Sequence, residues 1–124
     1  MSSHFDKLLG LNNDLLQKCN WIKARSAHDF KKFIIEEAGE VAEAVEKGDV
    51  KNLREELGDL IFVALLLAQH QELHGKFTVH DVLEGVSEKI IRRNPHVFGD
   101  LQLTDLHEIE VVWKKIKEKE KLGQ

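Results

Sequence analysis

The sequence predicts an all-α protein, folded as an antiparallel bundle of about four to five helices. The 124-residue chain contains one proline, Pro95, no tyrosine and only 6% aromatic residues, whereas strands favour aromatic and β-branched side chains. Apolar residues recur at helical spacing between glycines, and no Asn-Gly or Asp-Gly hairpin signal occurs. This length fits one domain, which we place over residues 1–124.

The first two predicted helices occupy the N-terminal third of the chain. The first runs from about Ser3 to Lys18 and is followed by an irregular stretch over residues 19–25. Ser26 can cap the second helix, since Asp29 three residues later completes a capping box, and this helix should continue to about Lys47.

Three further helices are predicted after residue 48. Asp49 can cap a helix that ends near residue 74, and Thr78 with Asp81 can start the next one. That helix should end near residue 93, because Pro95 disfavours helical geometry in the residue before it. Residues 95–101 read as a loop, and Thr104 can cap a last helix that ends near residue 122. The glycines expected to end helices are Gly10, Gly48, Gly75, Gly99 and Gly123.

Charge and cysteine content exclude several classes of protein. The formal net charge of −4 argues against general nucleic-acid binding, which needs a basic surface. The lone Cys19 excludes an intrachain disulfide and a multi-cysteine zinc site, and predicts a cytoplasmic location. The first ten residues are too polar for a signal peptide. The longest uncharged apolar run, residues 60–68, is about half of what spans a bilayer, so no membrane contact is expected.

The sharpest signal is a pair of acids on each of two neighbouring helices. At ~100° per residue, Glu37 falls in the middle of the apolar stripe of its helix, and Glu40 lies at the stripe's edge three residues later. Glu56 and Asp59 repeat this spacing on the next helix. Unpaired carboxylates resist burial, so four converging acids need a compensating positive charge. They either face solvent or pair with basic side chains, or they bind a metal ion, which the matched spacing favours.

The residue types favour a hard divalent cation. Carboxylate oxygens suit Mg²⁺, with Mn²⁺ as an alternative, rather than zinc or copper. A di-iron site would need histidines three residues after acids, and none of the seven histidines has an acid at that position. Because Mg²⁺ commonly shares its ligands with substrate phosphates, the acids indicate a phosphate-bearing ligand.

A basic group near the end of the fourth predicted helix complements these acids. Lys89, Arg92 and Arg93 can bind phosphate, or they can simply favour the C-terminal end of the helix dipole. Trp113, close to Lys117 on the last helix, is either a platform for base stacking or a core residue.

These motifs resemble the MazG family of all-α nucleoside triphosphate pyrophosphohydrolases. The resemblance rests on Glu36-Glu37-Ala-Gly-Glu40, on Glu56-Leu-Gly-Asp59, on the run from Lys89 to Phe98, and on Trp113-Lys-Lys-Ile-Lys117. It covers residues 19–120 or so.

The resemblance implies hydrolysis of a nucleoside triphosphate to the monophosphate and pyrophosphate. Carried onto this sequence, it implies that Mg²⁺ is held by Glu37, Glu40, Glu56 and Asp59. It further implies that the phosphates contact Lys89, Arg92 and Arg93, that Trp113 and Lys117 line the nucleotide site, and that the protein is a homodimer or homotetramer. Glu36 or Glu37 is expected to orient or deprotonate the attacking water. The alternatives are a catalytically weak nucleotide-binding or regulatory module and a purely structural bundle.

Overall fold

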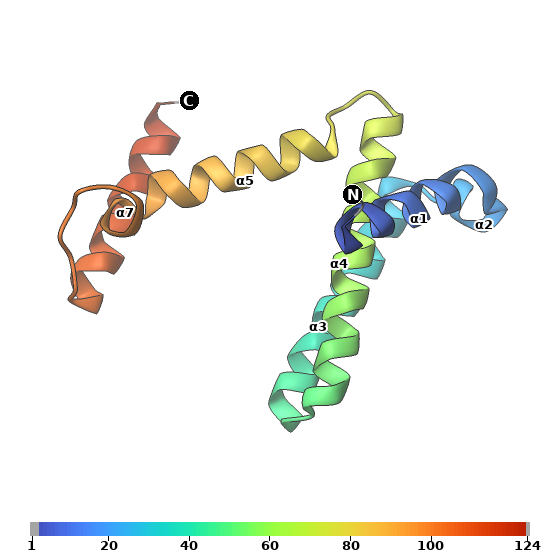
Figure 1. Cartoon of the computed structure of the whole chain (residues 1–124), viewed down its shortest axis with the longest axis horizontal. Coiled ribbons are helices and arrows are strands. Elements are labelled where there is room, and N and C mark those ends of the chain that lie inside the picture. Colours follow the sequence, from blue (N-terminus) through green and yellow to red (C-terminus); the bar gives the residue numbers. More distant parts are fainter. Residues whose placement is uncertain (1–2, 124) are drawn as a thin grey trace. The chain divides into compact units, whose positions relative to one another are not determined.

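The computed structural model describes residues 3–123, and these form helices joined by turns and loops (Figure 1). The all-α prediction is confirmed, since no strand occurs in the described range. The helices are α1 (His4–Lys18), α2 (Asn20–Lys23), α3 (Ala27–Lys47), α4 (Val50–Leu73), α5 (Val79–Arg93), α6 (Pro95–Phe98) and α7 (Leu106–Leu122). They divide into two compact units, Met1–Val79 and His80–Gln124.

The capping residues explain where the long helices of the first unit begin. The Ser26 hydroxyl accepts a hydrogen bond from the Asp29 amide, and the Asp29 carboxylate accepts one from the Ser26 amide, which is the predicted capping box. The Asp49 side chain accepts from the amide of Asn52 and so starts α4 as predicted. Gly48 between the two helices has a φ of 66°, a conformation that glycine adopts without a Cβ clash.

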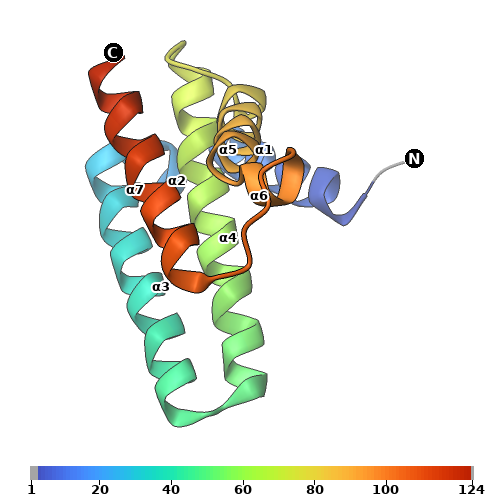
Figure 2. The same ribbon diagram turned by 90° about the vertical axis from the view of Figure 1, so that its left-hand side faces the viewer.

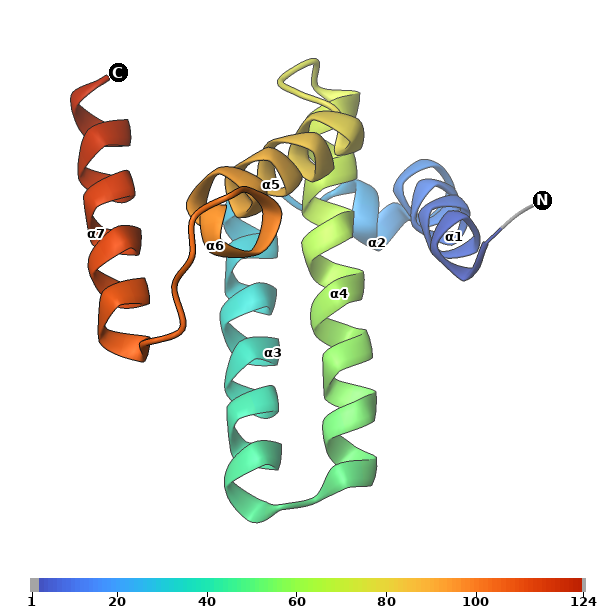
Figure 3. The same ribbon diagram turned by 60° about the vertical axis from the view of Figure 1, so that its left-hand side comes forward.

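Helices α3 and α4 form an antiparallel pair that organises the first unit (Figures 2 and 3). The core of the first unit contains Leu16 from α1, Phe30 from α3 and Leu66 from α4, of which Phe30 is fully buried. The amide of Gln69, also buried on α4, ties α4 to α1. It accepts a hydrogen bond from Asn12 Nδ2 at 2.9 Å and donates one to the Leu9 carbonyl at 2.8 Å.

The second unit consists of most of α5, followed by α6 and α7. Two side-chain bridges link α7 to the C-terminal end of α5 and the residue after it, and they are described with the site below. The Asp105 carboxylate accepts a hydrogen bond from the His107 amide and caps α7.

Four local predictions are wrong. Residues 20–23 form a helical turn inside the stretch predicted to be irregular, and residues 95–98 form another inside the predicted loop. Proline is favourable at the first position of a helix, which explains why Pro95 starts α6 as well as ending α5. Asp105 rather than Thr104 caps α7, and Gly10 lies inside α1 instead of ending it.

Candidate functional site

Three carboxylates from α3 and α4 come together in the first unit. One oxygen each of Glu37, Glu56 and Asp59 lies within 4.8 Å of the other two. Glu56 and Asp59 are three residues apart on α4 and therefore project from the same side of that helix. Glu37 and Glu56 are partly buried, whereas Asp59 is exposed. The packing of two antiparallel helices thus gathers acids that are up to 22 positions apart in the sequence.

The electrostatics of this cluster are unfavourable without a cation. Burial raises the pKa of the Glu37 carboxyl, and the charges of Asp59, Glu56 and Glu36 raise it further, as does a hydrogen bond with Glu56. Among the described residues, no lysine or arginine forms an ion pair with Glu37, Glu56 or Asp59. Within residues 3–79 of the first unit, therefore, no lysine or arginine neutralises these three acids. Hard, anionic oxygens at this spacing fit Mg²⁺ or Mn²⁺.

Two other predicted acids lie beside this cluster. Glu40 is exposed one turn further along α3, and its carboxylate is not among the three that converge. Glu36 is also exposed, and its charge acts on Glu37. The structure thus brings together three of the four predicted metal ligands.

In the second unit, the two predicted arginines share one carboxylate. Arg92 Nε donates to Glu120 Oε2 at 2.6 Å, while Arg93 Nη2 and Nε donate to Glu120 Oε1 at 2.9 and 3.3 Å. These charge-assisted hydrogen bonds hold the pKa of Glu120 at about 2, far below its ordinary value of 4.5. The carboxylate is therefore ionised throughout the neutral range.

The remaining predicted residues of this unit lie around the same two helices. Trp113 Nε1 donates to Asn94 Oδ1 at 2.9 Å, although the indole is 41% exposed. Lys117 lines a cavity of about 380 Å³ together with Arg93, Glu120 and Lys121. The cations among these lining residues suit an anionic ligand. Lys89 is exposed on α5, one turn before Arg93 and on the same side of that helix.

Glu120 and Asn94 were not singled out by the sequence analysis. Glu120 lies three residues after Lys117 and seven after Trp113, so all three share one face of a helix. That spacing was a usable signal. It was obscured because α7 ends in a run of alternating lysines and glutamates that resembles an ordinary solvated face.

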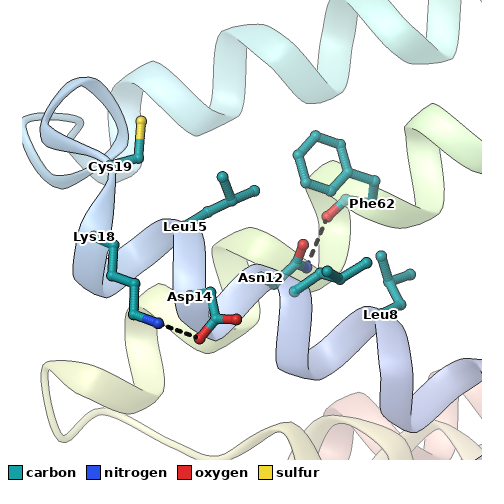
Figure 4. Close-up of a pocket in the computed structure, with 8 residues that line it drawn as sticks. Leu8, Asn12, Asp14, Leu15, Lys18, Cys19 and Phe62 are labelled. Atoms are coloured by element: carbon teal, nitrogen blue, oxygen red, sulfur yellow. Dashed lines mark hydrogen bonds and ion pairs between the residues drawn. The ribbon is translucent and has the colours of Figure 1, made fainter.

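A second cavity of about 510 Å³ lies in the first unit, where Leu8, Leu15 and Cys19 contribute to its wall beside Phe62 of α4 (Figure 4). Asn12 donates a 3.4 Å hydrogen bond to the Phe62 carbonyl at its edge. The cavity is mostly apolar and contains none of the acids described above. The carboxylate of Asp14 on its wall pairs with Lys18 at 3.5 Å.

Trp21, the other tryptophan, lies at the edge of the first unit. Its ring stacks on Phe33 with centroids 5.8 Å apart, and the Arg25 guanidinium lies 4.4 Å from its centroid. Trp21 is 54% exposed, so it lies at the surface of the first unit and not in its core. Among residues 3–123, no helix has the length and hydropathy needed to cross a membrane.

Comparison with known proteins places residues 25–98 in the MazG nucleotide pyrophosphohydrolase domain model. The matched range includes the three clustered carboxylates and Arg92 and Arg93, but it ends before Trp113. The crystal structure of a MazG-related protein from Thermotoga maritima is 35% identical and superposes with a TM-score of 0.80. The match covers 91% of this chain and 98% of that one.

Longer relatives show the same similarity. The uncharacterised protein YabN of Bacillus subtilis (strain 168) is 42% identical over 103 residues, which cover 83% of this chain and 21% of YabN. A nucleoside triphosphate pyrophosphohydrolase of Escherichia coli (strain K12) is 35% identical, with 83% of this chain matched to 39% of that protein. The chain therefore spans about two fifths or less of the length of these relatives.

Proposed function

The chain belongs to the MazG family, and we propose that it is a Mg²⁺-dependent nucleoside triphosphate pyrophosphohydrolase. It would convert an NTP or dNTP to the monophosphate and pyrophosphate. The observation that carries this proposal is the group of three carboxylates, Glu37, Glu56 and Asp59, within 4.8 Å of one another on two packed helices. Relatives named nucleoside triphosphate pyrophosphohydrolase support the reaction class.

The proposal assigns metal binding to Glu37, Glu56 and Asp59, with Glu40 as a further predicted ligand. When bound, the divalent cation would neutralise charge on the triphosphate and polarise its α-phosphorus. Glu36 or Glu37 orients the attacking water or accepts its proton, and Glu36 is favoured because it flanks the apolar stripe while Glu37 is assigned to the metal. The water oxygen bonds to the α-phosphorus, the bond to the bridging oxygen breaks, and pyrophosphate leaves.

Phosphate and base binding are assigned to the second unit. Lys89, Arg92, Arg93 and Lys117 are the proposed phosphate ligands, and Trp113 is the proposed stacking platform. The cavity lined by Arg93, Lys117 and Lys121 supports this assignment, since cations outnumber the one carboxylate there. A homodimer or homotetramer is also proposed, and sedimentation velocity would measure the oligomeric state.

A panel of NTPs and dNTPs with Mg²⁺, Mn²⁺ or EDTA tests the activity, with ³¹P NMR to identify the products. We expect monophosphate and pyrophosphate in Mg²⁺ and neither in EDTA. Glu56→Gln should lower kcat by about a hundredfold or more, because metal-assisted charge stabilisation contributes several kcal/mol. Glu55→Gln is the matched control, since Glu55 is the exposed neighbour on the same helix.

Two outcomes would contradict the proposal. Release of single orthophosphate would show a different reaction class. Metal-dependent nucleotide binding without any product would instead support the alternative of a nucleotide-binding or regulatory module.

A further inference from the structure

Two consecutive arginines of α5, Arg92 and Arg93, both bind the carboxylate of Glu120, an arrangement that helix geometry does not favour. Consecutive residues of an α-helix point ~100° apart, so adjacent arginines on α5 ordinarily diverge. Here both guanidinium groups meet one carboxylate, and each of its oxygens serves one arginine, at 2.6 Å for Arg92 and 2.9 Å for Arg93. Glu120 is only 17% exposed, whereas Arg92 is 53% exposed. The carboxylate therefore lies beneath the arginines, with part of the Arg92 side chain left open to solvent.

The hydrogen bonds leave donors free on both arginines. Arg92 is held through Nε, and among the described residues neither of its Nη groups has a partner. Arg93 uses Nε and Nη2, which leaves Nη1. A guanidinium has five N–H donors in a fixed plane, so fixing one edge orients the remaining donors as well.

We propose that Glu120 is a positioning residue that holds Arg92 and Arg93 side by side as a preassembled binding pair for the phosphates of a polyphosphate ligand. This inference rests on the proposed function for the identity of the substrate, because it assumes that the arginines bind its phosphates. Long side chains lose rotamer freedom when they bind a ligand. Glu120 has already restricted that freedom in the free protein, so an arriving anion binds with a smaller entropic cost.

The charge around the pair remains suited to an anion. Glu120 neutralises one positive charge, yet Arg93, Lys117 and Lys121 line the same cavity. The hydrogen bond from Trp113 to Asn94 adds a second link between α7 and the end of α5, two helical turns away from Glu120 on α7. The two links together fix the register of α7, which places Lys117 and Glu120 opposite the arginines.

Binding of inorganic tripolyphosphate to the full chain separates positioning from simple charge. Removing a carboxylate near an anion site should tighten anion binding if only net charge matters. If Glu120 positions the arginines, its removal should weaken anion binding. We expect Glu120→Gln to raise the tripolyphosphate Kd about tenfold by calorimetry at low salt, equivalent to about 1.4 kcal/mol. Glu118→Gln changes the net charge equally at an exposed position of α7 and should leave Kd unchanged or slightly lower.

Glu120→Asp tests rescue, since it keeps the carboxylate on a side chain one methylene shorter. Its Kd should lie between those of the wild type and Glu120→Gln. Circular dichroism shows whether each variant retains its helices. If Glu120→Gln loses helicity, the comparison of Glu120→Asp with the wild type decides the question.

The hydrolysis assay tests whether Glu120→Gln changes KM or kcat. Phosphate contacts made in both ground and transition states predict a raised KM for Glu120→Gln with kcat changed much less. The inference is overturned if Glu120→Gln tightens tripolyphosphate binding as Glu118→Gln does, if Kd does not change, or if the wild type does not bind tripolyphosphate. A wild type that binds tripolyphosphate in a Glu120-dependent way but hydrolyses no nucleotide refutes the proposed function and leaves this inference standing.

Discussion

Replacing Glu37 with glutamine should stabilise the metal-free protein while weakening its response to Mg²⁺. The substitution keeps the size of the side chain and removes one charge from the cluster with Glu56 and Asp59. Most substitutions of partly buried groups destabilise a protein, so an increase in stability would be a specific sign of stored repulsion.

The distances set the size of the effect. Two unit charges within 4.8 Å repel by about 0.9 kcal/mol at the dielectric constant of water and by about 3.5 kcal/mol at an effective value of 20. Since Asp59 is exposed, the water value is the appropriate one for that pair. Removal of the Glu37 charge eliminates two such repulsions, so we expect a gain of about 1–2 kcal/mol in EDTA. For a unit of this size, each kcal/mol raises Tm by about 4–8 °C.

Thermal unfolding by circular dichroism at pH 8 and low salt, in EDTA and in Mg²⁺, provides the assay. An ion that binds only the folded state adds about 2.7 kcal/mol of stability at a hundredfold excess over its Kd. The wild type should therefore gain more from Mg²⁺ than Glu37→Gln, in which a neutral amide oxygen replaces one anionic ligand. Glu46→Gln, at an exposed position of the same helix, is the control for loss of charge alone. If Glu37→Gln is no more stable than the wild type in EDTA, or if Mg²⁺ raises both Tm values equally, the repulsive metal site is refuted.

Three further predictions concern stability. Burial lowers the pKa of His70 below 6.5, so the unfolded chain binds protons more readily than the folded protein. The free energy of unfolding should therefore fall as the pH drops from about 7 through the folded-state pKa of His70. His70→Gln should weaken this pH dependence, which Tm values measured from pH 8 to 5 would show. Gln69→Leu should lower the free energy of unfolding by about 1–3 kcal/mol in urea titrations, because it removes the 2.9 Å acceptor of Nδ2 of the fully buried Asn12 and leaves only the longer 3.4 Å bond to the Phe62 carbonyl; an unchanged midpoint would contradict this. Gly48→Ala should destabilise by about 1 kcal/mol, since the residue has a φ of 66°, whereas Gly85→Ala within α5 should stabilise by about 1 kcal/mol, and equal Tm shifts would refute the distinction.

Much of the fold could be read from local chemistry. The Ser26–Asp29 capping box and the Asp49 cap are interactions within four residues of the chain, so their sequence signals are nearly sufficient. The helical turns at residues 20–23 and 95–98 were missed because such short helices have too few residues to show a periodic pattern.

The sequence predicted one part of the candidate site, and the packing of the helices decided the rest. Periodicity placed Glu37 and Glu56 on the inward stripes of their helices, and the structure brings them within 4.8 Å together with Asp59. Glu40 has the same spacing from Glu37 that Asp59 has from Glu56, yet it stays outside the group. Angular position around a helix does not say where along its axis the partner helix comes closest, and the packing of α3 against α4 decides that.

The amino-acid order alone therefore determined the long helices, the caps of α3 and α4 and the inward direction of Glu37 and Glu56, because each of these depends on neighbours within one or two turns. Only the tertiary structure decided which carboxylates converge and that Glu120 pairs with both Arg92 and Arg93. The contacts between helices at these places join residues 19 to 28 positions apart, and their geometry depends on the axial register with which whole helices pack.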